Sequence, residues 1–83
     1  MTIEQTYYPS PGLNQIYDAS IAYVRILMVA RTGQVHTETD IDATLVSGGL
    51  FYMYNFSEGS IMFNPNNPFL SGESVNIIYD PNI

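Results

Sequence analysis

Apolar and polar residues alternate along the last third of the chain with the period of β-strands. Ile61 and Phe63 alternate with less apolar neighbours, and Val75, Ile77 and Tyr79 are spaced in the same way. Such a period places every second side chain on one face of a strand, so each stretch buries one face. These two stretches are therefore predicted to be strands, joined by a loop rich in proline and asparagine.

A long strand is predicted over residues 21–30, because β-branched and aromatic residues dominate there and no helix cap is present. Both of its faces are apolar in the middle, with Val24, Ile26, Met28 and Ala30 on one and Tyr23, Arg25, Leu27, Val29 and Arg31 on the other. A strand with two apolar faces is covered on both sides. Because the chain is so short, the layer that packs on the second face is expected to come from another chain.

Turn residues divide the remaining chain into further strands. A hairpin turn is predicted at residues 31–34, with strands at 35–39, 50–56 and 60–64. No stretch shows a helical period, so the expected fold is all-β, a small antiparallel β-sandwich or partly open barrel. One core is expected to contain Ile26, Met28, Phe63, Val75 and Ile77.

The N-terminal segment differs from the rest because prolines and a glycine interrupt any regular element there. The expected organisation is an extended N-terminal arm, residues 1–20, followed by a β domain, residues 21–83. The arm has two alternatives, a first strand on its own sheet or a contact with a neighbouring subunit. The predicted partner interface consists of Tyr7, Tyr8, Leu13, Ile16, Tyr17, Leu27, Val29 and Tyr54.

Length and composition indicate a small domain that gains stability from partners. A chain of 83 residues buries only ~60% of its unfolded surface. It contains no cysteine, which excludes disulfides and thiolate metal sites. Apolar residues make up 46% of the chain and charged residues only 12%, about half the usual charged share. A homo-oligomer is therefore expected.

The charge balance excludes several kinds of partner. The net charge is −6, with two arginines and no lysine, so direct binding to nucleic acid or to an anionic membrane is not expected. The apolar run at residues 26–30 is far shorter than the ~20 residues of a spanning helix. The first residues lack a basic start and an apolar stretch, so no signal peptide is expected.

Glu38, Asp40 and Asp42 form one candidate metal site. On an extended segment their carboxylates point the same way, and Ca²⁺ prefers several such oxygens. The segment lacks the glycine and the closing glutamate of an EF-hand loop. A solvated strand face that resists edge pairing is the favoured interpretation, with no metal or cofactor.

Candidate catalytic residues are sparse. His36 is the single histidine, and no nucleophile motif or phosphate-binding loop accompanies it. An exposed or hydrogen-bonded strand histidine is favoured over a catalytic base, and no enzyme activity is expected. The seven tyrosines and four phenylalanines are assigned to the core and to subunit contacts, with stacking on sugars as the alternative.

Four segments carry a resemblance to a known group of proteins: a glycine turn at 31–33, a Gly-x-Ile-x-Phe strand at 59–63, a Gly-Glu turn within 68–73, and an apolar strand ending in tyrosine at 75–79. Their order resembles small β-sandwich modules of tailed-bacteriophage virion proteins, over residues 22–80. The connection at 40–49 and the proline-rich start depart from that pattern.

The resemblance implies a non-enzymatic virion structural protein, a capsid decoration, head fibre or tail component. Its implied partners are other virion proteins, and its implied location is the virion, assembled in the host cytoplasm. Two other classes stay open. One is a small acidic inhibitor that mimics DNA, and the other is a carbohydrate-binding adhesion module.

Overall fold

A strongly curled sheet of seven strands dominates the chain, of which the computed structural model describes residues 1–82. The elements in chain order are β1 Ile3–Tyr7, β2 Gln15–Tyr17, the 3₁₀ turn η1 Ala19–Ile21, β3 Arg25–Arg31, β4 Gln34–Glu38, α1 Asp42–Leu45, β5 Phe51–Asn55, β6 Ser60–Met62 and β7 Val75–Asp80. The expected mostly-β, partly open barrel is confirmed. It is a mixed sheet, because β4 and β5 pair in parallel.

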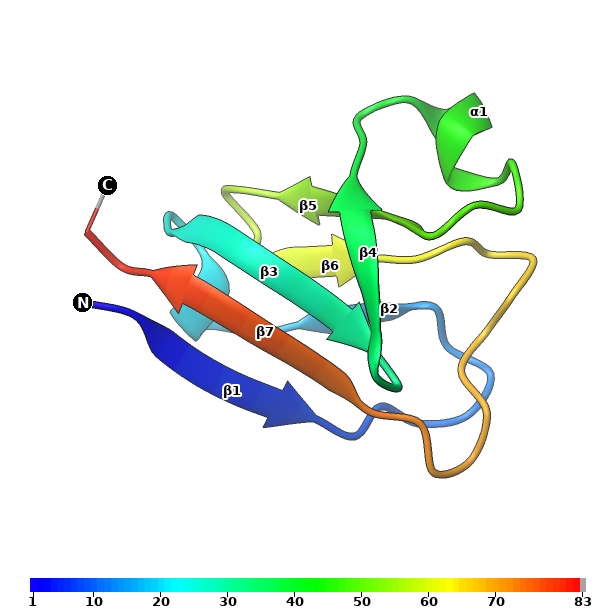
Figure 1. The fold of residues 1–83 in the computed structure, drawn as a ribbon, viewed down its shortest axis with the longest axis horizontal. Coiled ribbons are helices and arrows are strands. Elements are labelled where there is room, and N and C mark those ends of the chain that lie inside the picture. The colour runs from blue at the N-terminus through cyan, green and yellow to red at the C-terminus, as the bar shows by residue number, and fades with distance from the viewer. Residues whose placement is uncertain (83) are drawn as a thin grey trace.

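The strand order β1-β7-β3-β4-β5-β6-β2 places β1 and β2 at the two edges. Figure 1 shows β1, β7 and β3 in front of β6 and β2, with β4 crossing between the two halves. The sheet thus curls into a half-barrel that stays open between β1 and β2. Following the pairings around the sheet, β1 and β2 run in opposite directions.

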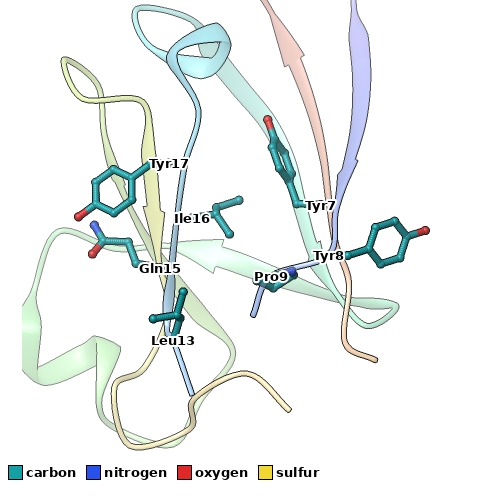
Figure 2. A pocket seen from close by; sticks show the side chains of 7 residues that line it. All are labelled: Tyr7, Tyr8, Pro9, Leu13, Gln15, Ile16 and Tyr17. Carbon is teal, nitrogen blue, oxygen red and sulfur yellow. The ribbon is translucent and has the colours of Figure 1, made fainter. Parts of the chain in front are cut away.

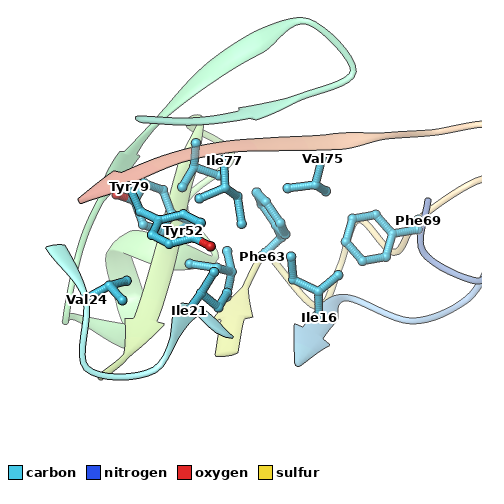
Figure 3. Packing of buried hydrophobic residues seen from close by; sticks show 11 residues of the cluster. Ile16, Ile21, Val24, Tyr52, Phe63, Phe69, Val75, Ile77 and Tyr79 are labelled. Atoms are coloured by element: carbon cyan, nitrogen blue, oxygen red, sulfur yellow. The ribbon is translucent and has the colours of Figure 1, made fainter. Parts of the chain in front are cut away.

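The core fills the concave side of this sheet (Figure 3). The predicted core residues Phe63, Val75 and Ile77 are fully buried, and Ile26 packs against them. The alternation predicted for residues 61–63 and 75–79 is therefore confirmed. The other members of the main cluster are Ile16, Ile21, Val24, Val29, Tyr52, Ile61, Phe69 and Tyr79.

A β-bulge in β3 corrects the expected faces of this strand. Ile26 pairs with Tyr79 and Met28 with Ile78, so one extra residue, Leu27, interrupts the register. An extra residue reverses the alternation beyond it. As a result Val29 is fully buried, whereas Met28 lies outside the main core, contrary to the prediction.

Residues 3–17 belong to the sheet and do not form an arm. Ile3–Tyr7 pairs antiparallel with β7 along its whole length, and Gln15–Tyr17 pairs with β6. The domain boundary predicted at residue 20 is therefore wrong, and the alternative of a first strand on its own sheet is correct. Prolines are accommodated because they lie in the loop between the two strands, where no ladder bond is needed.

The connection between β4 and β5 contains α1, a single turn of four residues that the sequence pattern does not predict. The backbone N–H of Leu45 donates to the carbonyl of Ile41, and the Leu45 side chain is buried. The turn packs against β5. Within residues 1–82, no helix is long and apolar enough to cross a membrane.

An ion pair between the buried Arg31 and the half-buried Glu73 joins β3 to the loop before β7. The Arg31 guanidinium donates to both Glu73 carboxylate oxygens, at 3.1 and 2.8 Å, and to the Pro68 carbonyl at 3.2 Å. It also lies over the Phe69 ring, 4.7 Å from the centroid. The Arg31 hydrogen bond is the largest cause that lowers the Glu73 pKa to about 2.

Candidate functional site: a groove between two sheet edges

A groove follows the opening of the half-barrel between β1 and β2 (Figure 2). Its volume is about 330 Å³. The residues that line it are Tyr7, Tyr8, Pro9, Leu13, Gln15, Ile16 and Tyr17, and it is referred to below as the β1–β2 groove. All the N-terminal residues predicted as a partner interface thus come together on one surface, although their role in binding stays a prediction.

The floor and the rims of the groove differ in character. Tyr7 and Ile16 both lie on the inner side of the gap, whereas Tyr8 and Tyr17 point outward on opposite sides of it (Figure 2). Ile16 is only 7% exposed, while Tyr8 and Tyr17 are 78% and 64% exposed. The groove therefore combines an apolar floor with amphipathic rims, a mixture that is typical of protein interfaces.

Hydrogen bonds to Asp18 hold the floor in place. The Tyr7 hydroxyl donates to the Asp18 carboxylate at 2.7 Å, and the Gln5 side-chain amide donates to the same oxygen at 3.2 Å. The other oxygen accepts from the Ser20 N–H at 2.9 Å. Because Asp18 directly follows β2 and Tyr7 ends β1, these bonds connect the two sheet edges.

The protonation states at this connection are stable around neutral pH. Burial, followed by the hydrogen bond to Asp18, raises the pKa of Tyr7 well above its ordinary value. The Ser20 backbone N–H, followed by the Tyr7 hydroxyl, lowers the pKa of Asp18. The phenol therefore keeps its proton and the carboxylate keeps its charge, so Tyr7 stays the donor.

The outer backbone edge of β1 is free, because β1 pairs with β7 on its other side. Thr32 donates its N–H to the Ser74 carbonyl at 2.7 Å, so the even-numbered residues of β7 face β3 and the odd-numbered ones face β1. The residues of β1 that bond to β7 are therefore the odd-numbered ones. Glu4 and Thr6 consequently direct their backbone N–H and C=O groups away from the sheet.

The free edge of β2 lies on the other side of the groove. The Phe63 N–H donates to the Asn14 carbonyl at 2.8 Å, and the Asp18 N–H donates to the Gly59 carbonyl at 2.9 Å. In an antiparallel ladder these bonds alternate along the strand, so residues 14, 16 and 18 face β6. Gln15 and Tyr17 direct their backbone groups toward the groove.

The charged side chains beside the groove are acidic. Glu4 is exposed on β1, and Asp18 follows β2. Glu58, in the turn before β6, accepts a hydrogen bond from the Ser60 hydroxyl at 3.2 Å, and Ser60 pairs with Tyr17. Both arginines lie on β3, which β7 separates from β1.

Three predicted interface residues lie away from the groove. Leu27 is 44% exposed at the bulge of β3, but Val29 is fully buried in the chain's own core. The Tyr54 hydroxyl donates to the Ile21 carbonyl inside the fold. Val29 and Tyr54 are therefore engaged within the chain, which corrects their assignment to a partner surface.

The other candidate residues are dispersed over several elements. Glu38 ends β4 and Asp42 begins α1, so the acidic run is not one extended face. Within residues 1–82, no three His, Asp or Glu side chains could hold a metal ion together. His36 lies 2.8 Å through Nδ1 from the Gln34 carbonyl, and its ring meets Phe63 edge-on.

The sequence interpretation missed Pro9, Gln15 and Asp18 as parts of the site. Asp18 had a local signal, since it precedes a short turn and accepts from the N–H two residues on, as helix-capping aspartates do. Pro9 and Gln15 had none, because their place in the groove depends on how the sheet curls.

Comparison of the chain with protein-family models, with curated proteins and with solved structures found no match.

Proposed function

We propose that this protein is a non-enzymatic structural subunit that binds other protein chains through the β1–β2 groove. The observation that carries the proposal is that two open sheet edges lie on either side of one apolar floor. Open edges offer backbone hydrogen bonds to another chain, and tyrosine-rimmed apolar surface favours protein contacts. The exposed Tyr8 and Tyr17 rings extend this surface on both sides.

The proposed setting is a virion, in which the chain would serve as a capsid decoration, head fibre or tail component. The main support for this setting is the resemblance of residues 22–80. A low charged share of 12% is in keeping with a subunit that is covered by partners in an assembly. The groove supports the binding role independently of the setting.

The geometry supports the two alternative functions less well. A DNA mimic needs a dense row of free carboxylates, but Glu73 is paired with Arg31 and Asp18 bonds to Tyr7. A sugar platform needs aromatic rings that face one ligand. Tyr8 and Tyr17 point in opposite directions instead (Figure 2).

Site-specific photo-crosslinking tests the proposed function. The photoreactive amino acid p-benzoylphenylalanine would replace Tyr17 in the full chain, expressed in its natural setting, and mass spectrometry would identify the products. We expect one defined protein partner at Tyr17. A matched replacement of Val35, which is 60% exposed on β4, should not give that product. Equal capture at both positions, or no protein product at Tyr17, would contradict the proposal.

A further inference from the structure

We infer that the β1–β2 groove takes up one extended segment of a partner protein as an added strand between β1 and β2. The segment carries apolar side chains at alternate positions and Lys or Arg at the positions between them. This inference rests on the proposed function, because it names what occupies the same groove. Three independent features of the groove lead to it.

The backbone of both edges requires an extended partner. Glu4 and Thr6 on β1 direct N–H and C=O groups away from β7, and Gln15 and Tyr17, which line the groove, direct theirs away from β6. A strand is the structure that satisfies a row of such groups on both of its own sides. Since β1 and β2 run in opposite directions, one inserted strand is parallel to one of them. The parallel β4–β5 pair shows that this sheet already contains such a junction.

The floor of the groove selects the alternating pattern. Successive side chains of an inserted strand point to opposite faces. Those that point inward meet Tyr7 and Ile16, which leave a cavity of about 330 Å³. This volume is at the small end for ligand pockets and suits a few apolar side chains. Those that point outward lie in solvent beside Tyr8 and Tyr17.

The acidic residues of the neighbouring elements favour basic side chains at the outward positions of the segment. Glu4 lies on β1, Asp18 directly follows β2 and Glu58 lies in the turn before β6, whereas both arginines are on β3. Opposite charge across an interface favours association and rejects partners of like charge. Basic residues at the outward positions therefore fit this groove. A second copy of the chain fits poorly, because each copy has a net charge of −6 and no lysine.

Peptide binding to the full chain tests the chemistry of the segment. The probe is a fluorescent peptide of about eight residues that alternates valine and lysine, a typical strand length. We expect saturable binding by fluorescence anisotropy that weakens as salt is added, because salt screens exposed charges. Replacing lysine by glutamate, or methylating alternate backbone nitrogens, should each weaken binding about tenfold or more, the equivalent of one or two hydrogen bonds.

Edge variants test where the segment binds. T6P removes an N–H on the free edge of β1, and an edge strand tolerates proline at such a position. T6A is its matched control, since both variants lose the Thr6 hydroxyl that accepts from Asn76 at 2.9 Å. We expect T6P to bind the peptide about tenfold more weakly than T6A. The pair Y17P and Y17A makes the same comparison on β2, and thermal melts confirm that each variant is folded.

The outcomes separate this inference from the proposed function. The inference is overturned if the lysine peptide does not bind, if the glutamate peptide binds equally well, or if T6P and T6A bind alike. Self-association that T6P abolishes would also overturn it, because the occupant would then be a second copy. Capture of a protein at Tyr17, together with equal binding by T6P and T6A, leaves the proposed function standing without strand insertion.

Discussion

Gly59 shows how a single residue allows two segments to approach closely. Its φ of +72° lies in the left-handed region, and an added Cβ would overlap the Asp18 carbonyl oxygen and lie 2.9 Å from the Ala22 nitrogen. Backbone atoms cannot yield as a flexible side chain can. The same approach lets the Asp18 N–H bond to the Gly59 carbonyl, so Gly59 also positions one end of the groove floor.

Replacement of Gly59 by alanine should lower the free energy of unfolding by about 2 to 4 kcal/mol, because left-handed strain adds to overlap with the backbone. Gly33→Ala is the matched control, since φ is +81° there and nothing lies within 4 Å of an added Cβ. It should cost only about 1 to 2 kcal/mol. Urea denaturation measures both values, and equal losses would contradict the role of the close contact.

Glu73→Gln should lower the free energy of unfolding at pH 7 by about 2 to 3 kcal/mol, because the Arg31 charge stays buried without its partner. The folded pKa of about 2 lies below the ordinary 4.5, so the contribution is complete above pH 4.5 and disappears as the pH falls toward 2. Urea denaturation across this range should show the two proteins converging. A constant difference down to pH 2 would refute the assignment, and the exposed Glu38→Gln variant serves as control.

At the scale of elements, β1 and β2 have two roles, one in the fold and one at the groove. Tyr7 packs against the core and Ile16 is part of it, while the outer backbone edges of both strands stay free. A short edge strand with tyrosines beside it can cover its neighbour and bind a partner at once. The N-terminal residues therefore serve stability and, in the proposed function, binding as well.

Deletion of residues 1–8 should abolish cooperative folding. It removes β1, so Val75, Ile77 and Tyr79 of β7 lose the strand that pairs beside them. The free energy lost with this strand is comparable to the whole free energy of unfolding of so small a domain, about 5 kcal/mol. Near-ultraviolet circular dichroism and thermal melts would report it. A truncated chain that melts cooperatively near the parent temperature would mean that β1 is a dispensable addition.

At the scale of the whole molecule, the half-barrel leaves one side of its cylinder open. The strand order puts the first two strands of the chain at opposite edges of a single sheet, and the curl of the sheet brings these edges toward each other (Figure 1). The edges are connected by the Asp18 hydrogen bonds but not by a strand ladder. In the proposed function, this opening is the place at which another chain completes the sheet.

Calcium should not change the melting temperature of the whole protein. Glu38 and Asp42 belong to different elements, so their carboxylates do not share one extended face with Asp40. A ligand that binds only the folded state must raise the melting temperature. Scanning calorimetry with added Ca²⁺ and with a chelator checks this, and a calcium-dependent rise of several degrees would show that these acids do form a site.

The sequence shows which residues make up much of the candidate site, but it does not show that they lie together. Tyr7, Tyr8, Leu13, Ile16 and Tyr17 stand out as apolar residues without an obvious strand partner. Their convergence on one groove could not be predicted, because it depends on which strands take the sheet edges. Val29 was misplaced for a related reason, since nothing in the local pattern signals the extra residue in β3.

The sequence by itself determined the mostly-β character, the hairpin at Thr32–Gly33 and the buried sides of β6 and β7. These features depend on alternation and turn residues, which act between close neighbours along the chain. Only the tertiary structure decided the bulge, the parallel β4–β5 pair, the inclusion of β1 and the groove. Each of these depends on contacts between residues far apart in the sequence, whose pairing is chosen by how the whole core packs.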